Sequence, residues 1–270
     1  MTAPSRPRFP LALERLQGAA RPAPADLLRP QRPLHQAVRE AARRIAPGGV
    51  GLDSDAVRAR LVERLRAGGI GDAALLEAFQ RVPRHRFVDS AFAAQAYEDT
   101  SLPIGHDQTI SKPSVVARML ALLRDGASAR RAGGHLGRVL EIGSGCGYQA
   151  ALLSLLADRV VSIERLRPLH EKARAHLGGW RGGEIRLLHG DGTLGHAAAA
   201  PYDSIVAAAG GGELPPAWLE QLADGGRLVA PVYDGSSRSQ VLVVVDRVGG
   251  RVVRRTEEPV RFVPLRRGTA

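Results

Sequence analysis

The chain has 270 residues, a formal net charge of +11, 44% hydrophobic residues and a single cysteine. This length suffices for one substantial buried core with an appendage. No apolar run approaches the roughly 18–20 residues of a membrane span, and no stretch near residue 1 has the apolar segment of a secretory signal. Because the lone Cys146 excludes an internal disulfide, we expect a cytoplasmic globular protein.

The positive charge is concentrated at the beginning of the chain. Residues 1–50 hold nine arginines and three acids, a net +6, whereas the remaining 220 residues carry +5. A basic chain can bind nucleic acid. Here nearly all basic residues are arginine, which favours a compositional bias over a designed binding face. We therefore do not expect the folded part to bind nucleic acid.

Residues 1–50 are rich in proline, arginine and alanine and have no sustained periodicity. Their prolines interrupt any long helix, so we expect a mostly disordered extension, with short helices at most over residues 11–17 and 34–45. The alternatives are an arginine-rich tether to an anionic partner and a targeting peptide. A folded domain is expected over residues 51–266.

Three helices are predicted before the sheet begins. The first starts at Asp55 or the serine before it and stops at the glycines 68–69, and Asp72 can cap the second. Residues 84–110 look irregular. Pro113 then occupies a position where the first turn of a helix accepts proline.

From residue 137 onwards apolar strands alternate with helices. Strands are predicted at residues 138–142, 159–163, 184–188, 202–207 and 226–231, and helices at 148–157, 167–177 and 215–222. Continuously apolar strands are typical of a parallel sheet covered on both faces. Residues 240–248 and 251–263 are predicted as further strands without helices between them. We therefore expect an α/β fold with a doubly wound, mostly parallel sheet, N-terminal helices and C-terminal antiparallel strands.

The most informative segment is the glycine turn that follows strand 138–142. Gly143, Gly145 and Gly147 form a G-x-G-x-G pattern, with Glu141 before it and Ser144 within it. Glycines permit positive φ and let backbone amides approach a ligand. Dinucleotide sites use the longer G-x-G-x-x-G spacing, whereas the tighter spacing led by an acid is typical of class I S-adenosylmethionine enzymes. We expect all five residues to bind that cofactor.

Two acids stand at the next two strand ends. The carboxylate of Glu164 can accept hydrogen bonds from both ribose hydroxyls. Asp191 can accept from the exocyclic amine of adenine, and Gly192 keeps the ring slot open. Each feature alone has an ordinary alternative, an exposed acid at a strand end or an Asp-Gly turn. Because ligands of open α/β sheets bind at the carboxyl ends of strands, we expect the three residues to bind the cofactor together.

Other polar residues admit structural explanations. Cys146 has no accompanying Cys/His pattern, so a small loop residue is favoured over a nucleophile. The histidines have no metal-ligand spacing, no metal is expected, and His106 is expected to be structural. Ser111 precedes Pro113, and its alternative role is to cap the helix that follows.

A series of motifs resembles the protein-L-isoaspartate O-methyltransferase family. In chain order they are RVPRHRFV at residues 81–88, YED at 97–99, LPIG at 102–105, QTIS at 108–111, LEIGSGCGY at 140–148, GDG at 190–192, APYDSIV at 200–206, PV at 231–232 and PVRFVPL at 259–265. They span about residues 52–266. The Thr-Ile-Ser segment joined to the glycine loop is specific, whereas the loop alone would indicate only a methyltransferase.

The resemblance implies a class I methyltransferase with S-adenosylmethionine as methyl donor. Separately, we expect the protein to be a monomer. The implied substrate is the free α-carboxylate of L-isoaspartyl residues in aged proteins and peptides, whose methyl ester collapses to a succinimide and reopens partly to aspartate. Ser111 maps to the active-site serine of the family, and Thr109 and Ile110 would close over the cofactor. A carboxyl group with a pKa of about 4 is already ionised at neutral pH, so it needs no catalytic base.

Two positions depart from the family pattern. Asp107 stands where a glycine is usual, although aspartate tolerates the left-handed region better than most residues. Residues 114–116 (Ser-Val-Val) replace the aromatic or histidine that often follows Pro113. Three other functions remain open at this point: a nicotinamide-dependent oxidoreductase, a methyltransferase for another acceptor, and a non-catalytic RNA-associated protein.

Overall fold

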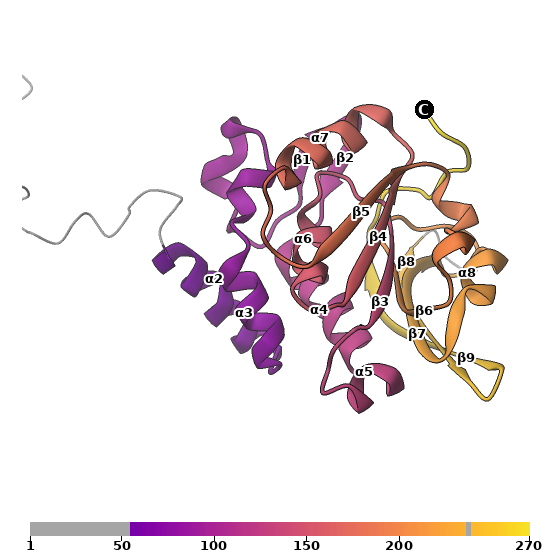
Figure 1. Ribbon diagram of the computed structural model, residues 1–270. Coiled ribbons are helices and arrows are strands. Elements are labelled where there is room, and N and C mark those ends of the chain that lie inside the picture. Colours follow the sequence, from indigo (N-terminus) through magenta and orange to yellow (C-terminus); the bar gives the residue numbers. More distant parts are fainter. Residues whose placement is uncertain (1–54, 236–238) are drawn as a thin grey trace, which may run out of the picture. The chain divides into compact units, whose positions relative to one another are not determined.

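The computed structural model describes residues 55–235 and 239–270 (Figure 1). The expectations for residues 1–50, and for a domain boundary at residue 51, fall outside the described residues and stay predictions.

The first two of the predicted helices are present. Helix α2 (Asp55–Ala67) buries Leu61 and Leu65, and helix α3 (Ala73–Arg81) begins at Asp72, whose side chain accepts a hydrogen bond of 3.0 Å from the amide of Leu75. That bond satisfies one of the donors that a helix start leaves unpaired. The sequence signal at this cap is therefore confirmed.

Residues 84–110 are more regular than expected. They form the short turns η3 (Arg84–Phe87) and η4 (Ser90–Gln95), followed by a hairpin of β1 (Leu102–Gly105) and β2 (Gln108–Ile110). His106 and Asp107 make the turn with φ values of 54° and 56°. Two central residues with positive φ are typical of tight hairpin turns, so Asp107 does occupy the left-handed region that a glycine would fill more easily.

Helix α4 (Pro113–Arg124) follows the hairpin directly, with Pro113 in its first turn. A short helix α5 (Ala127–Arg131) leads into the sheet. Helix α4 packs against the sheet through an apolar face that includes Val116, Leu120 and Leu123, none of them more than 2% exposed.

The main sheet has seven strands in the order β5-β4-β3-β6-β7-β8-β9. The strands are β3 (Arg138–Ile142), β4 (Arg159–Glu164), β5 (Glu184–His189), β6 (Tyr202–Ala207), β7 (Leu222–Tyr233), β8 (Gln240–Val248) and β9 (Arg251–Val260). Strands β3 to β7 are parallel, and β8 pairs antiparallel with both β7 and β9. The expected mostly parallel sheet with antiparallel C-terminal pairing is confirmed.

Helices cover both faces of this sheet (Figure 1). Alternate strand residues enter two separate hydrophobic clusters, as the two-residue repeat of a strand requires. Helices α2 to α5, α6 (Tyr148–Ser154) and α7 (Arg167–Leu177) contribute to the cluster on one face, and Trp218 of α8 (Pro216–Glu220) packs into the cluster on the other. Within the described residues no helix is both long and apolar enough to cross a bilayer.

Candidate active site

A cavity of about 310 Å³ lies at the carboxyl ends of the parallel strands. Its walls come from the β1–β2 hairpin, the loops after β3, β4, β5 and β6, and the segment after β9. Small-molecule sites of open α/β sheets occupy this edge, where the chain connects strands to helices. Five of the residues expected to bind the cofactor line the cavity: Thr109, Gly143, Gly145, Glu164 and Gly192.

The glycine loop after β3 is held tightly against β4. Gly143 has a φ of 90°, and its amide donates to the carbonyl of Ile163 at 2.8 Å. A Cβ on Gly145 would lie 3.2 Å from the side chain of Ile104 in the hairpin. The loop therefore needs glycine both for its backbone conformation and for its close approach to β1. Gly147, with a φ of 91°, precedes the first residue of α6 and does not line the cavity.

Glu164 is fixed at the tip of β4 by two backbone amides. Its Oε2 accepts a hydrogen bond of 2.9 Å from Gly145, and its Oε1 accepts one of 2.9 Å from Leu166. The residue is 5% exposed, yet it lines the cavity. Each carboxylate oxygen retains a second lone pair, so Glu164 can still accept hydrogen bonds from a ligand diol.

Glu141 lies beneath the loop and does not line the cavity. It is completely buried, and its Oε2 accepts a hydrogen bond from Ser162, whose hydroxyl also contacts the hydroxyl of Ser144. Burial raises the pKa of Glu141 to about 8, although the hydrogen bond from Ser162 opposes this. Glu141 and Ser144 thus support the loop from within.

Asp191 accepts a hydrogen bond from the segment that follows β9. Its Oδ2 accepts a hydrogen bond of 2.6 Å from the amide of Gly268, and its Oδ1 accepts from the amide and hydroxyl of Thr193. Partial burial raises the pKa of Asp191, but these hydrogen bonds outweigh it and lower the pKa overall. Beside it, a Cβ on Gly192 would lie 2.6 Å from Ile142, so this wall requires a glycine.

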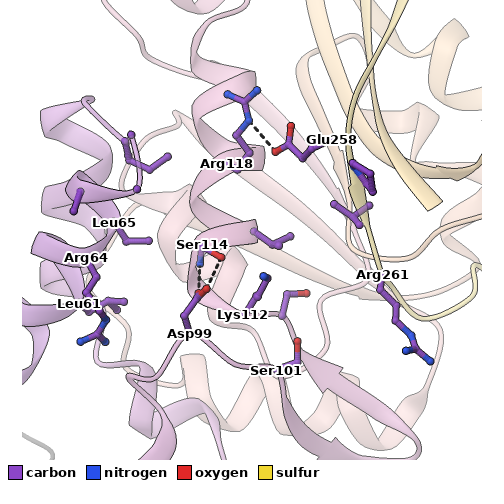
Figure 2. A pocket seen from close by; sticks show the side chains of 18 residues that line it. Leu61, Arg64, Leu65, Asp99, Ser101, Lys112, Ser114, Arg118, Glu258 and Arg261 are labelled. Atoms are coloured by element: carbon purple, nitrogen blue, oxygen red, sulfur yellow. Dashed lines mark hydrogen bonds and ion pairs between the residues drawn. The ribbon is translucent and has the colours of Figure 1, made fainter. Parts of the chain in front are cut away.

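Ser111 lines a different cavity, of about 1200 Å³. This cavity lies between α2, the start of α4 and β9 (Figure 2). Ser111 does not cap α4, because the cap position is Lys112, which forms no side-chain cap bond. Asp99 performs that role instead, since its two carboxylate oxygens accept from the amide and hydroxyl of Ser114, each at 2.8 Å. The hydroxyl of Ser111 is therefore not committed to the helix.

The short segment from Thr109 to Ser111 thus borders both cavities. Thr109 lines the smaller one and Ser111 the larger one, whereas Ile110 between them is buried in the core. Sequence reasoning had not singled out Asp99 or the charged residues of the larger cavity. The Tyr-Glu-Asp motif was a signal for the former, but nothing in the sequence located the latter.

The lone cysteine does not have the environment of a nucleophile. Cys146 is 3% exposed, and burial raises the pKa of its thiol to about 11. No group of three or more potential metal ligands occurs in the part of the chain that the structure describes. His106 lies at the exposed hairpin turn and lines the smaller cavity.

The fold and this edge of the sheet define a class I S-adenosylmethionine-dependent methyltransferase. The sequence model of the family described as protein-L-isoaspartate(D-aspartate) O-methyltransferase matches residues 56–270, so the chain belongs to this family.

Relatives with the same name match nearly the whole chain. The protein-L-isoaspartate O-methyltransferase of Methylibium petroleiphilum is 58% identical over 97% of each chain, and that of Leptothrix cholodnii is 57% identical over 99% of this chain and 96% of its own. A solved protein-L-isoaspartate O-methyltransferase shares 29% identity with a TM-score of 0.68, covering 77% of this chain and 65% of that one. A Plasmodium falciparum structure with bound S-adenosyl-L-homocysteine (22% identity, TM-score 0.63, 77% of this chain and 97% of that one) shares the fold.

Proposed function

We propose that this protein transfers a methyl group from S-adenosylmethionine to the free α-carboxylate of L-isoaspartyl residues in damaged proteins and peptides, which initiates their repair. Membership of the family supports the reaction. The observation that carries the residue assignment is the Thr109–Ser111 segment, which borders a nucleoside-sized cavity on one side and a larger cavity on the other.

The smaller cavity has the features that an adenosyl cofactor requires. Glu164 would accept hydrogen bonds from the ribose hydroxyls, and Gly143 and Gly145 would bring backbone amides to the amino-acid end. Gly192 would leave room for the adenine ring. When bound, S-adenosylmethionine supplies an electrophilic methyl group.

The remaining assignments concern residues that do not line the smaller cavity. Glu141, Ser144 and Gly147 would act by holding the glycine loop, and Ile110 by holding the hairpin over the cofactor. Asp191 has one carboxylate oxygen on Gly268. Because each carboxylate oxygen has a further lone pair, we propose that Asp191 still accepts a hydrogen bond from the exocyclic amine of adenine.

On the acceptor side the protein has to orient a group that is already reactive. A carboxyl group with a pKa of about 4 is ionised at neutral pH, so no general base is required. The hydroxyl of Ser111 would donate a hydrogen bond to this carboxylate and align it. Alignment and the exclusion of water from the carboxylate are the contributions expected from the chain itself.

The setting of the reaction is part of the proposal. We assign the protein to the cytoplasm as a monomer, acting on isoaspartyl proteins and peptides without nucleic acid. Residues 51–266 would form the methyltransferase domain, and residues 1–50 a proline- and arginine-rich extension.

The test is methyl transfer from labelled S-adenosylmethionine to an isoaspartyl peptide, with the aspartyl peptide of the same sequence as control. We expect label only in the isoaspartyl peptide. Equal labelling of both peptides, or of neither, would contradict the proposed substrate. A parallel titration with NADH and with S-adenosylhomocysteine tests the oxidoreductase alternative, which requires binding of NADH.

A further inference from the structure

Arg84 is a buried cation that pairs with no carboxylate in the described segments, although the charge of Asp99 favours its ionised form. It stands in η3, is 0% exposed, and forms no ion pair with any carboxylate among residues 55–235 and 239–270. Burial lowers the pKa of its guanidinium. Removing a charge from water is costly unless strong polar contacts compensate, so its surroundings indicate what the residue does.

Three segments meet at this guanidinium. Its Nε donates to the carbonyl of Ala96 at 2.8 Å, and its Nη2 donates to the carbonyl of Ser111 at 2.8 Å. Its central carbon lies 4.8 Å from the ring centre of Tyr148, the first residue of α6 after the glycine loop. A single side chain therefore joins the serine segment of one cavity to the glycine loop of the other.

These contacts depend on the planar shape of arginine. A guanidinium can donate to two carbonyls in its plane while its face lies on an aromatic ring, whereas the ammonium of lysine is a compact point charge. The Nη1 of Arg84 and the hydroxyl of Tyr148 form no hydrogen bond of good geometry within the described chain, although the hydroxyl also favours the charged form of the guanidinium. The two carbonyls and the ring face are thus the contacts that position the group.

We propose that Arg84 is a positioning residue for the methyl transfer reaction: by binding the carbonyl of Ser111 while lying on Tyr148, it sets the serine at a fixed distance from the cofactor loop. The inference rests on the proposed function, since it assigns a purpose to the position of Ser111. The proposal predicts that replacing the guanidinium of Arg84 lowers kcat more than it weakens cofactor binding.

The main test is Arg84→Lys, with kcat measured on an isoaspartyl peptide and the affinity for S-adenosylhomocysteine measured by calorimetry. Because misplacement of a reacting group by about 1 Å can cost about 100-fold in rate, we expect kcat to fall by about 10- to 100-fold. The affinity should stay within about twofold, since Glu164 and the glycine amides are untouched. A folded variant with unchanged kcat would overturn the proposal, whatever its melting temperature.

Arg124→Lys is the matched control. Arg124 is a second buried arginine, 8% exposed, and it binds Asp72 and the carbonyl of Gly134 away from both cavities. We expect this variant to lose stability while the kcat of the folded protein is unchanged. The comparison separates a positioning role from the general cost of disturbing a buried guanidinium.

A double-mutant cycle tests whether Arg84 acts through Ser111. In the Ser111→Ala background the hydroxyl that Arg84 positions is absent, so Arg84→Lys should reduce kcat by no more than about twofold further. Fully additive losses would show that Arg84 acts on the reaction by another route and would overturn the proposal.

Tyr148 provides a second route if Arg84→Lys does not fold. Tyr148→Leu removes the ring under the guanidinium and should lower kcat without weakening S-adenosylhomocysteine binding, whereas Tyr148→Phe keeps the ring and should lower kcat less than Tyr148→Leu does. Equal kcat in both variants would overturn the proposal. Failure of the wild-type protein to methylate the isoaspartyl peptide would instead contradict the proposed function.

Discussion

Oε2 of Glu164 accepts a hydrogen bond of 2.9 Å from the amide of Gly145, which joins the tip of β4 to the loop after β3. This contact orients the carboxylate before any ligand arrives, because its other oxygen is held by Leu166. A preorganised acceptor of this kind binds a ligand without a loss of side-chain entropy.

Glu164→Ala should weaken S-adenosylhomocysteine binding by about 10- to 100-fold, the effect of losing hydrogen bonds to a charged group. Calorimetric titration measures this directly. Glu171→Ala, an exposed acid on α7, is the control and should bind normally. Unchanged affinity in the first variant would remove Glu164 from the ribose assignment.

Ser111→Ala should lower kcat on an isoaspartyl peptide by about 10-fold or more, because the carboxylate loses a donated hydrogen bond. Binding of S-adenosylhomocysteine should be preserved, since Ser111 does not line the cofactor cavity. Steady-state kinetics check the rate, with the exposed Ser90→Ala as control. A normal rate in Ser111→Ala would leave the serine without a role in the reaction.

Asp99→Ala should destabilise the protein by about 1 kcal/mol, the usual value of a helix cap, because the amide and hydroxyl of Ser114 both donate to Asp99. Urea unfolding measures the change. Its neighbour Glu98→Ala is the matched control and should unfold as the wild type does. Equal stability of the two variants would contradict the capping role.

Glu141→Gln should change the pH dependence of stability. The pKa of Glu141 is about 8 in the folded protein, above its ordinary 4.5, so the folded state holds a proton that the unfolded state has lost. Folding therefore becomes less favourable as pH rises from about 5 to about 8. A glutamine at this position does not titrate, so the variant does not lose stability in this way. The melting temperature of the variant should exceed that of the wild type increasingly across this range, and a constant difference would contradict the assignment.

The charged side chains of the larger cavity predict that the protein prefers substrates with acidic residues beside the isoaspartate. Arg118 is paired with Glu258, whereas Lys112 and Arg261 have no ion-pair partner in the described segments and outnumber the one remaining carboxylate of the cavity, Asp99 (Figure 2). A peptide with a flanking glutamate should have a KM about two- to fivefold lower than its glutamine counterpart, and salt should reduce the difference.

Lys112→Glu should reverse this preference in the same pair of peptides. Arg86→Glu makes the same change of charge at an exposed residue that does not line the cavity. The control should keep the wild-type ratio of KM values. Equal KM values for both peptides in the wild type would contradict the predicted role of the cavity charges.

Strongly periodic segments were predictable from the sequence. The limits of β3, β6 and α7 coincide with the predicted 138–142, 202–207 and 167–177, because continuous apolar strands and an amphipathic helix leave little ambiguity. Strand β7 begins at Leu222, earlier than residue 226, with an irregular register against β6. Such irregular pairing depends on the neighbouring strand and has no local signal.

Parts that depend on distant segments were not predictable. The hairpin at residues 102–110 lacks the Asn-Gly or Asp-Gly pair that marks a tight turn. The hydrogen bond from the amide of Gly268 to Asp191 depends on where the segment after β9 lies, which the sequence around Asp191 does not indicate. Arg84 lies in the RVPRHRFV motif, but nothing in its local sequence shows that its side chain is buried against Ser111 and Tyr148. The cofactor loop could be located because the carboxyl ends of parallel strands meet at one edge.

Thr109 and Ser111 are only two positions apart, yet they serve separate openings. We therefore expect a large damaged protein held at the larger cavity to leave the entrance of the smaller one open. A small spent nucleoside could then be replaced while the macromolecular substrate stays docked, and we expect the two reactants to bind without a compulsory order.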